Sequence, residues 1–338
     1  MEQSPMAKAP EGPVPVVVMG LGFIGQEIAR AAMSSPEVEL IGAVDVQSGL
    51  VGRPLGDVLG SPAPRVKVSA SLAQAVGKRK GVVVLHATGS RLPKVFDQVM
   101  EAVKLGLPVA STCEELAFPY LKYPELADEL DQAAQKAGVA VVGTGVNPGF
   151  VLDRLVAVAG QVCGPVRRAT VTRVVDARTR RPSLQRIVGA GLSEEEFFEL
   201  VDSEQLGHVG LVESAALAAL GLGLDCDDFE EEVAPVFAEE DISGGAFPVR
   251  KGRVAGMFQS VVGLEDGQER VRLELTIAMG ADDPKDRIEI DADPKLVLEI
   301  PGGVAGDRAT ANALVNAAPR LTAAEAGLLT VLELPAGR

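Results

Sequence analysis

The feature that most constrains the fold is a glycine-punctuated turn between an apolar run and a helical pattern near the start of the chain. The apolar run Val16–Met19 leads into Gly20-Leu21-Gly22-Phe23-Ile24-Gly25, and the helical pattern follows directly. In such a turn the first glycine permits a tight bend, the second lets the backbone approach a pyrophosphate, and the third lets helix and strand pack closely. A second apolar run ends on Asp45, 20 positions after Gly25, where a carboxylate can accept hydrogen bonds from both ribose hydroxyls. This order of parts predicts a dinucleotide site that includes Gly20, Gly22, Phe23, Ile24, Gly25 and Asp45.

The first 150 residues alternate apolar runs with helical patterns, which is typical of a doubly wound α/β fold. Several runs are continuous Val, Leu and Ala, as in parallel strands that are covered on both faces. Strands are expected at Val14–Met19, Leu40–Val44, Val66–Ser69, Val82–His86, Val109–Ser111 and Val139–Val142. Helices are expected at Gly25–Met33, Leu72–Val76, Leu92–Lys104 and Pro124–Ala137. We therefore predict a flexible leader over residues 1–12 and a Rossmann-type dinucleotide-binding domain over residues 13–150.

After Phe150 the pattern changes to longer segments in which apolar and polar residues alternate. Val271–Ile277 is the clearest of these segments, and it is followed by Arg287–Asp291 and Leu296–Ile300. A helix is expected before them, over Val151–Val158. The pattern predicts a second α+β domain with a mixed or antiparallel sheet over residues 151–303, half-buried and suited to the contacts of a homodimer.

Two further segments carry weaker signals. The acidic stretch Asp225–Glu232 is interpreted as a solvated loop or helix face. In the segment 304–338 we expect a helix that is capped by Asp307 and ends before Pro319. This terminal segment is expected to pack back on the dinucleotide-binding domain.

Charge and cysteine content exclude several classes of function. The formal net charge of −15 opposes binding to a phosphate backbone, so no nucleic-acid partner is expected. The 3 cysteines are too few for a disulfide framework and lack metal-ligand spacing, which favours a reducing cytoplasmic setting and predicts no metal site. Because the chain has no uninterrupted apolar stretch of about 18 residues, no membrane span is expected.

The residues that follow each strand are candidates for the site, because open parallel sheets bind ligands beyond the carboxyl ends of their strands. After the fourth strand, Thr88 and Gly89 are suited to lining the ribose and nicotinamide. The alternative is an ordinary loop in which Ser90 caps the next helix. His86 itself is more typical of a hydrogen-bonded buried histidine than of a catalytic group.

Two adjacent carboxylates, Glu114 and Glu115, follow the fifth strand in the run Ser111-Thr112-Cys113-Glu114-Glu115. A carboxylate whose pKa is raised by desolvation can transfer protons near neutral pH. The alternative is a capping box, since Ser111 with Glu114 and Thr112 with Glu115 both have its spacing. Ser111 and Thr112 are also predicted to line the cofactor site.

The turn after the sixth strand, Gly143–Phe150, contains Asn147, which is suited to holding the nicotinamide carboxamide. The alternative is an ordinary turn, because Pro-Gly is a common turn signal. In the second domain, a basic cluster can anchor a substrate carboxylate or pair with surface acids. Its members are Arg173, Arg178, Arg180 and Arg181. The loop Gly207-His208-Val209-Gly210 has no assigned role.

The glycine turn, the run Gly42-Ala43-Val44-Asp45 and Val51-Gly52 resemble the cofactor domain of dihydrodipicolinate reductases. Longer stretches resemble the 2,4-diaminopentanoate dehydrogenases and the native NAD(P)-dependent amine dehydrogenases. These stretches are Ser111–Leu116, Gly143–Phe150, Asp153, Arg180–Gln185, Gly207–Ser214 and Gly306–Thr310. The paired-histidine and Lys-x-x-x-Gly-Thr-type motifs of the reductases are missing from the sequence, so the resemblance to the reductases stops at the cofactor domain.

The resemblance implies an enzyme that interconverts an amine with a ketone or aldehyde and ammonia, using a nicotinamide cofactor. It also implies that one glutamate of the Glu114-Glu115 pair is catalytic, with Glu114 the first choice. Asp45 favours NAD, because its charge opposes a 2′-phosphate, although Gln47, Ser48 and Arg53 keep NADP possible. Two other functions stay open: a reductase of an oxo acid that uses no ammonia, and a nucleotide-binding sensor that does no chemistry.

Overall fold

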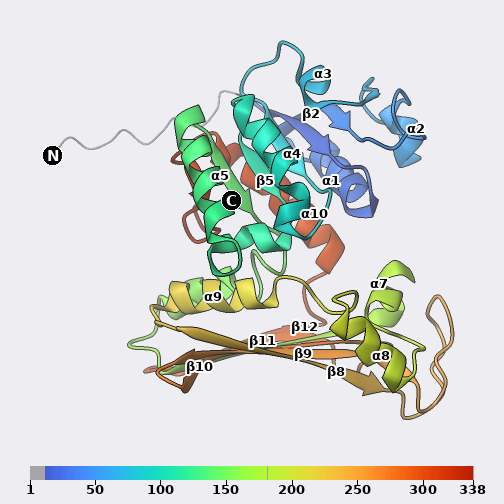
Figure 1. Cartoon of the computed structure of the whole chain (residues 1–338), viewed down its shortest axis with the longest axis vertical. Coiled ribbons are helices and arrows are strands. Elements are labelled where there is room, and N and C mark those ends of the chain that lie inside the picture. Colours follow the sequence, from blue (N-terminus) through green and yellow to red (C-terminus); the bar gives the residue numbers. More distant parts are fainter. Residues whose placement is uncertain (1–11, 181, 338) are drawn as a thin grey trace. The chain divides into compact units, whose positions relative to one another are not determined.

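A computed structural model describes residues 12–180 and 182–337 of the chain, which form two compact units (Figure 1). The first unit comprises the described residues up to Phe150 together with those from Ala305 onward, and the second comprises Val151–Val304. Apart from Gly12, the predicted leader lies outside the described residues.

The first unit contains a seven-stranded sheet in the order β13-β6-β5-β4-β1-β2-β3. Every neighbouring pair in it is parallel, which confirms the predicted Rossmann-type sheet. The edge strand β13 was not expected from the sequence, because a segment of three residues is too short to show periodicity. The strands are β1 (Val14–Met19), β2 (Val38–Val44), β3 (Val68–Ser69), β4 (Val83–His86), β5 (Val109–Ser111), β6 (Ala140–Gly143) and β13 (Gly327–Leu329).

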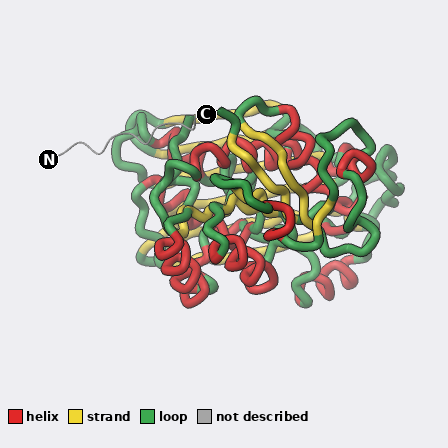
Figure 2. Tube along the Cα trace, turned by 90° about the horizontal axis from the view of Figure 1, so that it is seen from above, coloured by secondary structure: helices red, strands yellow, loops and turns green. Residues whose placement is uncertain are grey.

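Helices alternate with these strands along the chain. Figure 2 colours helices red and strands yellow. They are α1 (Phe23–Ser34), α2 (Leu55–Leu59), α3 (Leu72–Val76), α4 (Leu92–Lys104), α5 (Pro124–Ala137) and α10 (Gly306–Leu321), with the 3₁₀ helices η1 (Glu114–Ala117) and η2 (Pro119–Leu121). The bounds predicted for α10 are wrong. Ala305 is its N-cap, so Asp307 lies in the first turn, and Pro319 lies inside the helix. A proline so close to the end removes a single backbone donor, and the helix continues to the buried Leu321.

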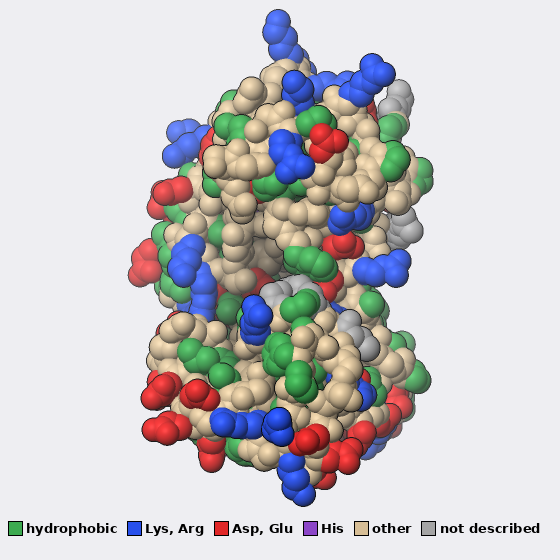
Figure 3. Space-filling view, turned by 90° about the vertical axis from the view of Figure 1, so that its right-hand side faces the viewer, with side chains coloured by type: hydrophobic (Ala, Val, Ile, Leu, Met, Phe, Trp, Pro, Cys, Tyr) green, Lys and Arg blue, Asp and Glu red, His purple; other side chains and the backbone are tan. Residues whose placement is uncertain are grey.

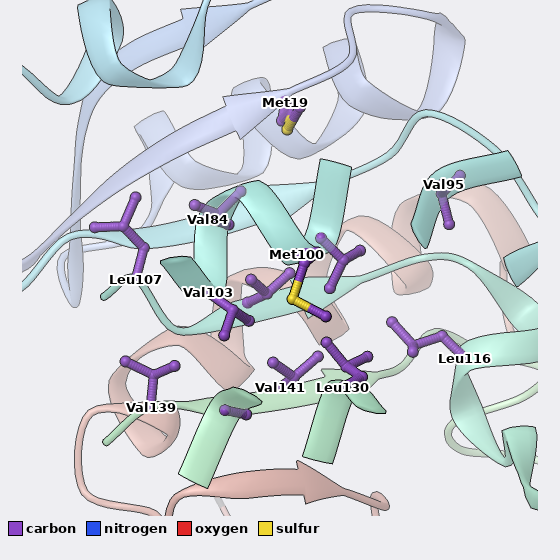
Figure 4. Packing of buried hydrophobic residues seen from close by; sticks show 14 of the residues in the cluster. Met19, Val84, Val95, Met100, Val103, Leu107, Leu116, Leu130, Val139 and Val141 are labelled. Carbon is purple, nitrogen blue, oxygen red and sulfur yellow. The ribbon is translucent and has the colours of Figure 1, made fainter. Parts of the chain in front are cut away.

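One buried cluster of the first unit lies between the sheet and helices α3, α4 and α5 (Figure 4). Met19 from β1, Met100 from α4, Leu130 from α5 and Val141 from β6 belong to one buried cluster. Leu116 joins the same cluster from η1. Burying a side chain of this size contributes roughly 1.5–3 kcal/mol, so the cluster fixes η1 against the sheet.

The second unit is built on a six-stranded sheet in the order β12-β11-β7-β10-β9-β8. Only β7 and β10 pair in parallel; the other neighbours are antiparallel, so the predicted mixed sheet is confirmed. The strands are β7 (Arg168–Asp176), β8 (Asp228–Phe237), β9 (Val254–Glu265), β10 (Gln268–Ala278), β11 (Lys285–Asp291) and β12 (Leu296–Pro301). The helices are α6 (Arg154–Gly160), α7 (Pro182–Ile187), α8 (Glu194–Asp202) and α9 (Leu211–Leu222), with a 3₁₀ helix η3 (Ala177–Thr179).

Two predictions about this unit are wrong. The acidic stretch at 225–232 is a loop only up to residue 227, since from Asp228 onward it forms the edge strand β8. The helix expected from Val151 starts at Arg154 instead, because Asp153 is its N-cap and accepts a hydrogen bond from Arg154 N at 2.5 Å. The second oxygen of Asp153 accepts from Ser214 Oγ at 2.9 Å, which ties α6 to α9.

Candidate functional site at the carboxyl edge of the parallel sheet

The predicted site segments follow strands whose carboxyl ends lie at one edge of the sheet. Met19, the last residue of β1, pairs with Val44 of β2 and with His86 of β4. Ser111, the last residue of β5, pairs with His86 and with Gly143 of β6. The loops after these strands therefore start at the same level, at the edge where open parallel sheets bind ligands.

The glycine turn has the geometry that a bound dinucleotide requires. Gly20 has a φ of +92°, and a Cβ atom built there would lie 2.5 Å from the Ala87 carbonyl oxygen. A Cβ on Gly25 would lie 1.8 Å from the Gly20 carbonyl oxygen, so this position allows the closest packing of helix on turn. Gly22 differs, because a Cβ there would have no described atom within 4 Å. Gly22 is the N-cap of α1, and the space above it is therefore suited to a phosphate at the start of a helix.

Phe23 and Ile24 are the first two residues of α1. Their backbone amides lie in the first turn, at the positive end of the helix dipole. The predicted acid of the second strand is adjacent: Asp45 Oδ2 accepts from Leu21 N at 2.7 Å, and Oδ1 accepts from Gln47 N at 2.8 Å. The carboxylate is thus fixed beside the glycine turn.

His86 is fully buried behind this edge and forms hydrogen bonds through both ring nitrogens. Nδ1 lies 2.8 Å from Ser111 Oγ, and Nε2 lies 2.7 Å from Thr88 Oγ1. Burial lowers the pKa of His86 to about 4, although a hydrogen bond with Gln98 opposes the shift, so the ring is neutral at pH 7. Thr88 itself is exposed and Gly89 is half-buried.

The segment after β5 is organised by backbone hydrogen bonds to buried groups. Thr112 N donates to the His86 carbonyl oxygen at 2.9 Å, and Cys113 N donates to Ser111 Oγ at 3.0 Å. Cys113, and not Ser111 or Thr112, is the N-cap of η1, so the capping-box interpretation is wrong. Burial raises the pKa of the Cys113 thiol to about 12, which keeps it protonated and unreactive at neutral pH.

The two adjacent glutamates have different environments. Glu115 is fully buried, and its Oε1 lies 3.0 Å from Arg91 Nη1 while its Oε2 accepts from Leu92 N at 2.8 Å. Lys122 Nζ and Tyr123 OH lie farther from the same Oε1, at 3.7 Å and 3.5 Å. Glu115 therefore caps the start of α4, whereas the alternative interpretation of the sequence assigned this role to Ser90.

Glu114 is half-buried and is the first residue of η1. It follows β5, whose carboxyl end lies at the same edge of the sheet as the glycine turn. The two glutamates thus differ in burial.

Asn147 lies in the turn after β6 and precedes a cis peptide bond to Pro148. The turn is held from the end of the chain, because Val146 N donates to Thr310 Oγ1 of α10 at 3.2 Å. Gly149 has a φ of +128°, and a Cβ there would lie 2.2 Å from Gly145 N. Sequence reasoning noticed the Gly306–Thr310 motif but missed that Thr310 supports this turn.

The basic cluster of the second unit is largely engaged in ion pairs. Arg173 Nη1 lies 2.6 Å from Asp286 Oδ1 and both side chains are buried, while Arg178 pairs with Asp176 at 2.7 Å. The Arg180 carbonyl oxygen accepts from Gln185 Nε2 at 2.9 Å. Arg181 lies outside the described residues.

The loop around His208 is held through its backbone. His208 N donates to Gln259 Oε1 at 2.7 Å, and the His208 carbonyl oxygen accepts from Gln259 Nε2 at 3.0 Å. The side-chain amide of Gln259, in β9, thus bonds to the backbone of this loop as a neighbouring strand would.

Three observations concern other kinds of site. Within residues 12–180 and 182–337, no group of three or more His, Cys, Asp or Glu side chains is placed to hold a metal ion. None of the helices in these residues combines the length and apolar character needed to cross a membrane. On the face drawn in Figure 3, acidic and basic side chains are interspersed.

Two family models match the chain. The 2,4-diaminopentanoate dehydrogenase C-terminal domain matches residues 150–338, which is more than half of the chain. The N-terminus of dihydrodipicolinate reductase matches residues 14–109, so the likeness to reductases ends inside the first unit.

Individual proteins show the same division. The chain is 28% identical over 337 residues to 2,4-diaminopentanoate dehydrogenase from Acetoanaerobium sticklandii, covering 96% of this chain and 94% of that protein. It is 35% identical over 108 residues to 4-hydroxy-tetrahydrodipicolinate reductase from Synechocystis sp., covering 29% of this chain and 38% of the reductase. The structure of an amine dehydrogenase from Mycobacterium smegmatis has the same fold, with a TM-score of 0.83 at 22% identity and 98% coverage of both chains.

Proposed function

Because this chain belongs to the 2,4-diaminopentanoate dehydrogenase family, we propose that it is a nicotinamide-dependent amine dehydrogenase, which interconverts an amine with a carbonyl compound and ammonia. One observation carries the assignment of residues: the division between two neighbouring carboxylates. Glu115 is held by Arg91 and by the start of α4, whereas Glu114 lies half-buried at the ligand-binding edge. We infer that Glu115 serves the structure and that Glu114 serves the chemistry.

The residues of the first unit fit a nicotinamide cofactor. The open space above Gly22 and the first turn of α1 suit the pyrophosphate, and Asp45 suits the ribose hydroxyls. When bound, the cofactor supplies or accepts the hydride. Thr88, Gly89, Thr112 and Asn147 follow strands at the same edge, which supports placing the nicotinamide half near them. Ser111, the last residue of β5, is buried with its hydroxyl at His86 Nδ1, so it lies behind these residues and does not line the cofactor site as predicted.

The carboxylate of Asp45 favours NAD over NADP, because a 2′-phosphate beside it would meet a negative charge. Arg53 is exposed on the loop that follows, and it offers a charge that a 2′-phosphate can use. We therefore expect NADH to be the better cofactor, with measurable use of NADPH. Comparison of kcat/KM for the two reduced cofactors tests this preference, and a higher value for NADPH contradicts it.

Glu114 is the group that moves protons. In reductive amination it takes a proton from bound ammonium, so that ammonia can attack the carbonyl carbon. In its protonated form it then helps water to leave the carbinolamine. Its negative charge also stabilises the iminium that develops before reduction. Loss of such a group costs about 10²–10⁴ in rate.

A panel of ketones, aldehydes and oxo acids, assayed with reduced cofactor in the presence and absence of ammonium, tests the function. An amine dehydrogenase oxidises the cofactor only when both carbonyl and ammonium are present. Oxidation that needs an oxo acid but no ammonium identifies a reductase instead. Cofactor binding without turnover of any carbonyl identifies a nucleotide-binding sensor.

A homodimer through the sheet of the second unit is part of the proposal. The strand register places Val174, Thr276 and Phe258 in one row across β7, β10 and β9, and all three are half-buried. The neighbouring row aligns Leu275 with Gln259, whose side-chain amide holds the loop before α9, so that row faces α9. Successive residues of a strand point to opposite faces, so the row of Val174, Thr276 and Phe258 faces away from α9. Phe258→Glu should convert a dimer to a monomer in light scattering, and an unchanged mass would refute this interface.

A further inference from the structure

We propose that His86 is a positioning residue that couples the Thr88 hydroxyl at the cofactor edge to the backbone of the Glu114 turn. A chain of directional hydrogen bonds makes this coupling. The inference rests on the proposed function, since it takes Thr88 as a cofactor contact and Glu114 as the group that transfers protons.

The directions of the hydrogen bonds follow from the neutral ring, in which one nitrogen donates and the other accepts. Gln98 Oε1 lies 3.4 Å from Nε2, and because a carbonyl oxygen only accepts, we place the proton on Nε2. Nε2 then donates to Thr88 Oγ1 at 2.7 Å, and Nδ1 accepts from the Ser111 hydroxyl at 2.8 Å. The single Nε2 hydrogen is thus directed at Thr88 Oγ1, with Gln98 Oε1 as a more distant acceptor.

At the outer end, this arrangement sets the Thr88 hydroxyl as a donor. Its oxygen uses a lone pair to accept from His86, so its own hydrogen points away from the ring. Thr88 is exposed and lies against the glycine turn, since a Cβ built on Gly20 would be 2.9 Å from Thr88 Cγ2. The hydroxyl is therefore directed toward an acceptor oxygen of a ligand held at that turn, such as a ribose or carboxamide oxygen.

At the inner end, the same arrangement sets the Ser111 oxygen as an acceptor. Its hydrogen goes to His86 Nδ1, and its lone pairs receive Cys113 N at 3.0 Å. Cys113 is the N-cap of η1 and directly precedes Glu114, so this bond fixes the peptide before Cys113, one residue ahead of the glutamate. The His86 carbonyl oxygen holds the same segment by accepting from Thr112 N at 2.9 Å.

Two substitutions of His86 test its hydrogen bonds to Thr88 and to Ser111 separately. The side-chain amide of Asn lies near the position of Nδ1, and that of Gln lies near the position of Nε2. His86→Asn keeps an acceptor for Ser111 and loses the bond to Thr88. His86→Gln keeps a donor for Thr88 and loses the bond to Ser111. Each lost hydrogen bond corresponds to a change of about 2–10-fold.

We expect His86→Asn to weaken NADH binding about 2–10-fold, measured by NADH fluorescence, and to leave kcat within about 2-fold of wild type. His86→Gln should leave the Kd for NADH within about 2-fold and lower kcat about 2–10-fold. Thr88→Val should weaken NADH binding like His86→Asn, and the double variant should bind no more weakly than either single variant.

Equal losses of NADH affinity and kcat in both His86 variants would overturn the coupling. Variants that keep the wild-type Kd for NADH and the wild-type kcat, and change only in Tm, would overturn it as well. Should a His86 variant fail to fold, Ser111→Ala tests the inner end with a single hydroxyl removed, and it should lower kcat at an unchanged Kd for NADH. An unchanged kcat in that variant refutes the inference. The affinity measurement needs no carbonyl substrate, so failure of the amine reaction is distinguishable from failure of this inference.

Discussion

Replacing Glu115 with Gln tests the proposal that Glu115 is structural and that Glu114 is the reacting carboxylate. Glu115 is fully buried, with Oε1 3.0 Å from Arg91 Nη1 and Oε2 2.8 Å from Leu92 N. Gln keeps the volume, so the variant leaves no cavity, but its NH₂ group must face one of these donors. Loss of a hydrogen bond to a charged group costs roughly 1.5–3 kcal/mol and weaker capping of α4 adds about 1 kcal/mol. We therefore expect a loss of about 2–4 kcal/mol in the free energy of unfolding.

Thermal unfolding followed by calorimetry measures this loss. For a unit of this size, 1 kcal/mol shifts Tm by about 2–4 °C, so Glu115→Gln should lower Tm by about 5–15 °C. The matched control is Glu114→Gln, one position earlier and half-buried. We expect it to keep Tm within about 3 °C of wild type while kcat falls about 10²–10⁴-fold.

The opposite pattern refutes the assignment. If Glu115→Gln unfolds like wild type and loses turnover, while Glu114→Gln keeps full turnover, the catalytic acid is Glu115. Normal NADH binding must be shown for each variant, because loss of the cofactor would also abolish turnover.

Three other perturbations test the architecture. Gly25→Ala should prevent stable folding, because its Cβ would lie 1.8 Å from a backbone oxygen, whereas Gly22→Ala should keep Tm within about 2 °C and weaken NADH binding; thermal scans and NADH titration compare the two. The pKa of His86 is about 4 when folded and 6.5 in the unfolded chain, so between these values only the unfolded state binds the proton and stability falls as the pH falls, by up to about 3 kcal/mol. Urea unfolding from pH 6.5 to pH 4 should therefore show a shallower pH dependence for His86→Asn than for wild type, and equal slopes contradict the shift. Asp286→Asn removes the carboxylate that pairs with the buried Arg173 guanidinium and should cost about 3–5 kcal/mol by urea unfolding; a loss below about 1 kcal/mol contradicts the importance of the pair.

The parallel sheet was predictable because its signals are local. A strand covered on both faces reads as a continuous apolar run, and the strands β1 and β5 have the bounds that such runs predict. The strand β8 carries a mixed signal, since acids occupy successive positions from Glu230 to Glu232. Its structure depends on a neighbour: the β8 backbone pairs with β9, and Glu231 Oε1 accepts from Gln259 Nε2 at 2.8 Å. The segment alone does not contain that partner.

The candidate site divides in the same way. The sequence predicted which loops meet at the carboxyl edge, because a parallel sheet brings all of its strand ends to one side. It could not tell Glu114 from Glu115, because the groups that distinguish them come from the preceding loop, with Arg91 and Leu92 more than 20 positions away. The difference between the two glutamates arises from tertiary packing, so the sequence around two adjacent identical residues does not reveal it.

The most distant contact of the site joins the turn before Asn147 to the end of the chain. Val146 N and Thr310 Oγ1 are separated by 164 positions, and β13 completes the same sheet by pairing with β6. Contacts of such separation must close a long loop, so they form at a greater entropic cost than the β1-α1-β2 segment that holds Asp45 beside the glycine turn. The glycine turn and Asp45 are thus encoded within one short stretch of sequence. The turn of Asn147 instead depends on Thr310, which comes after the whole of Val151–Val304 in the chain. Local sequence signals are for this reason stronger for the glycine turn and Asp45 than for the turn of Asn147.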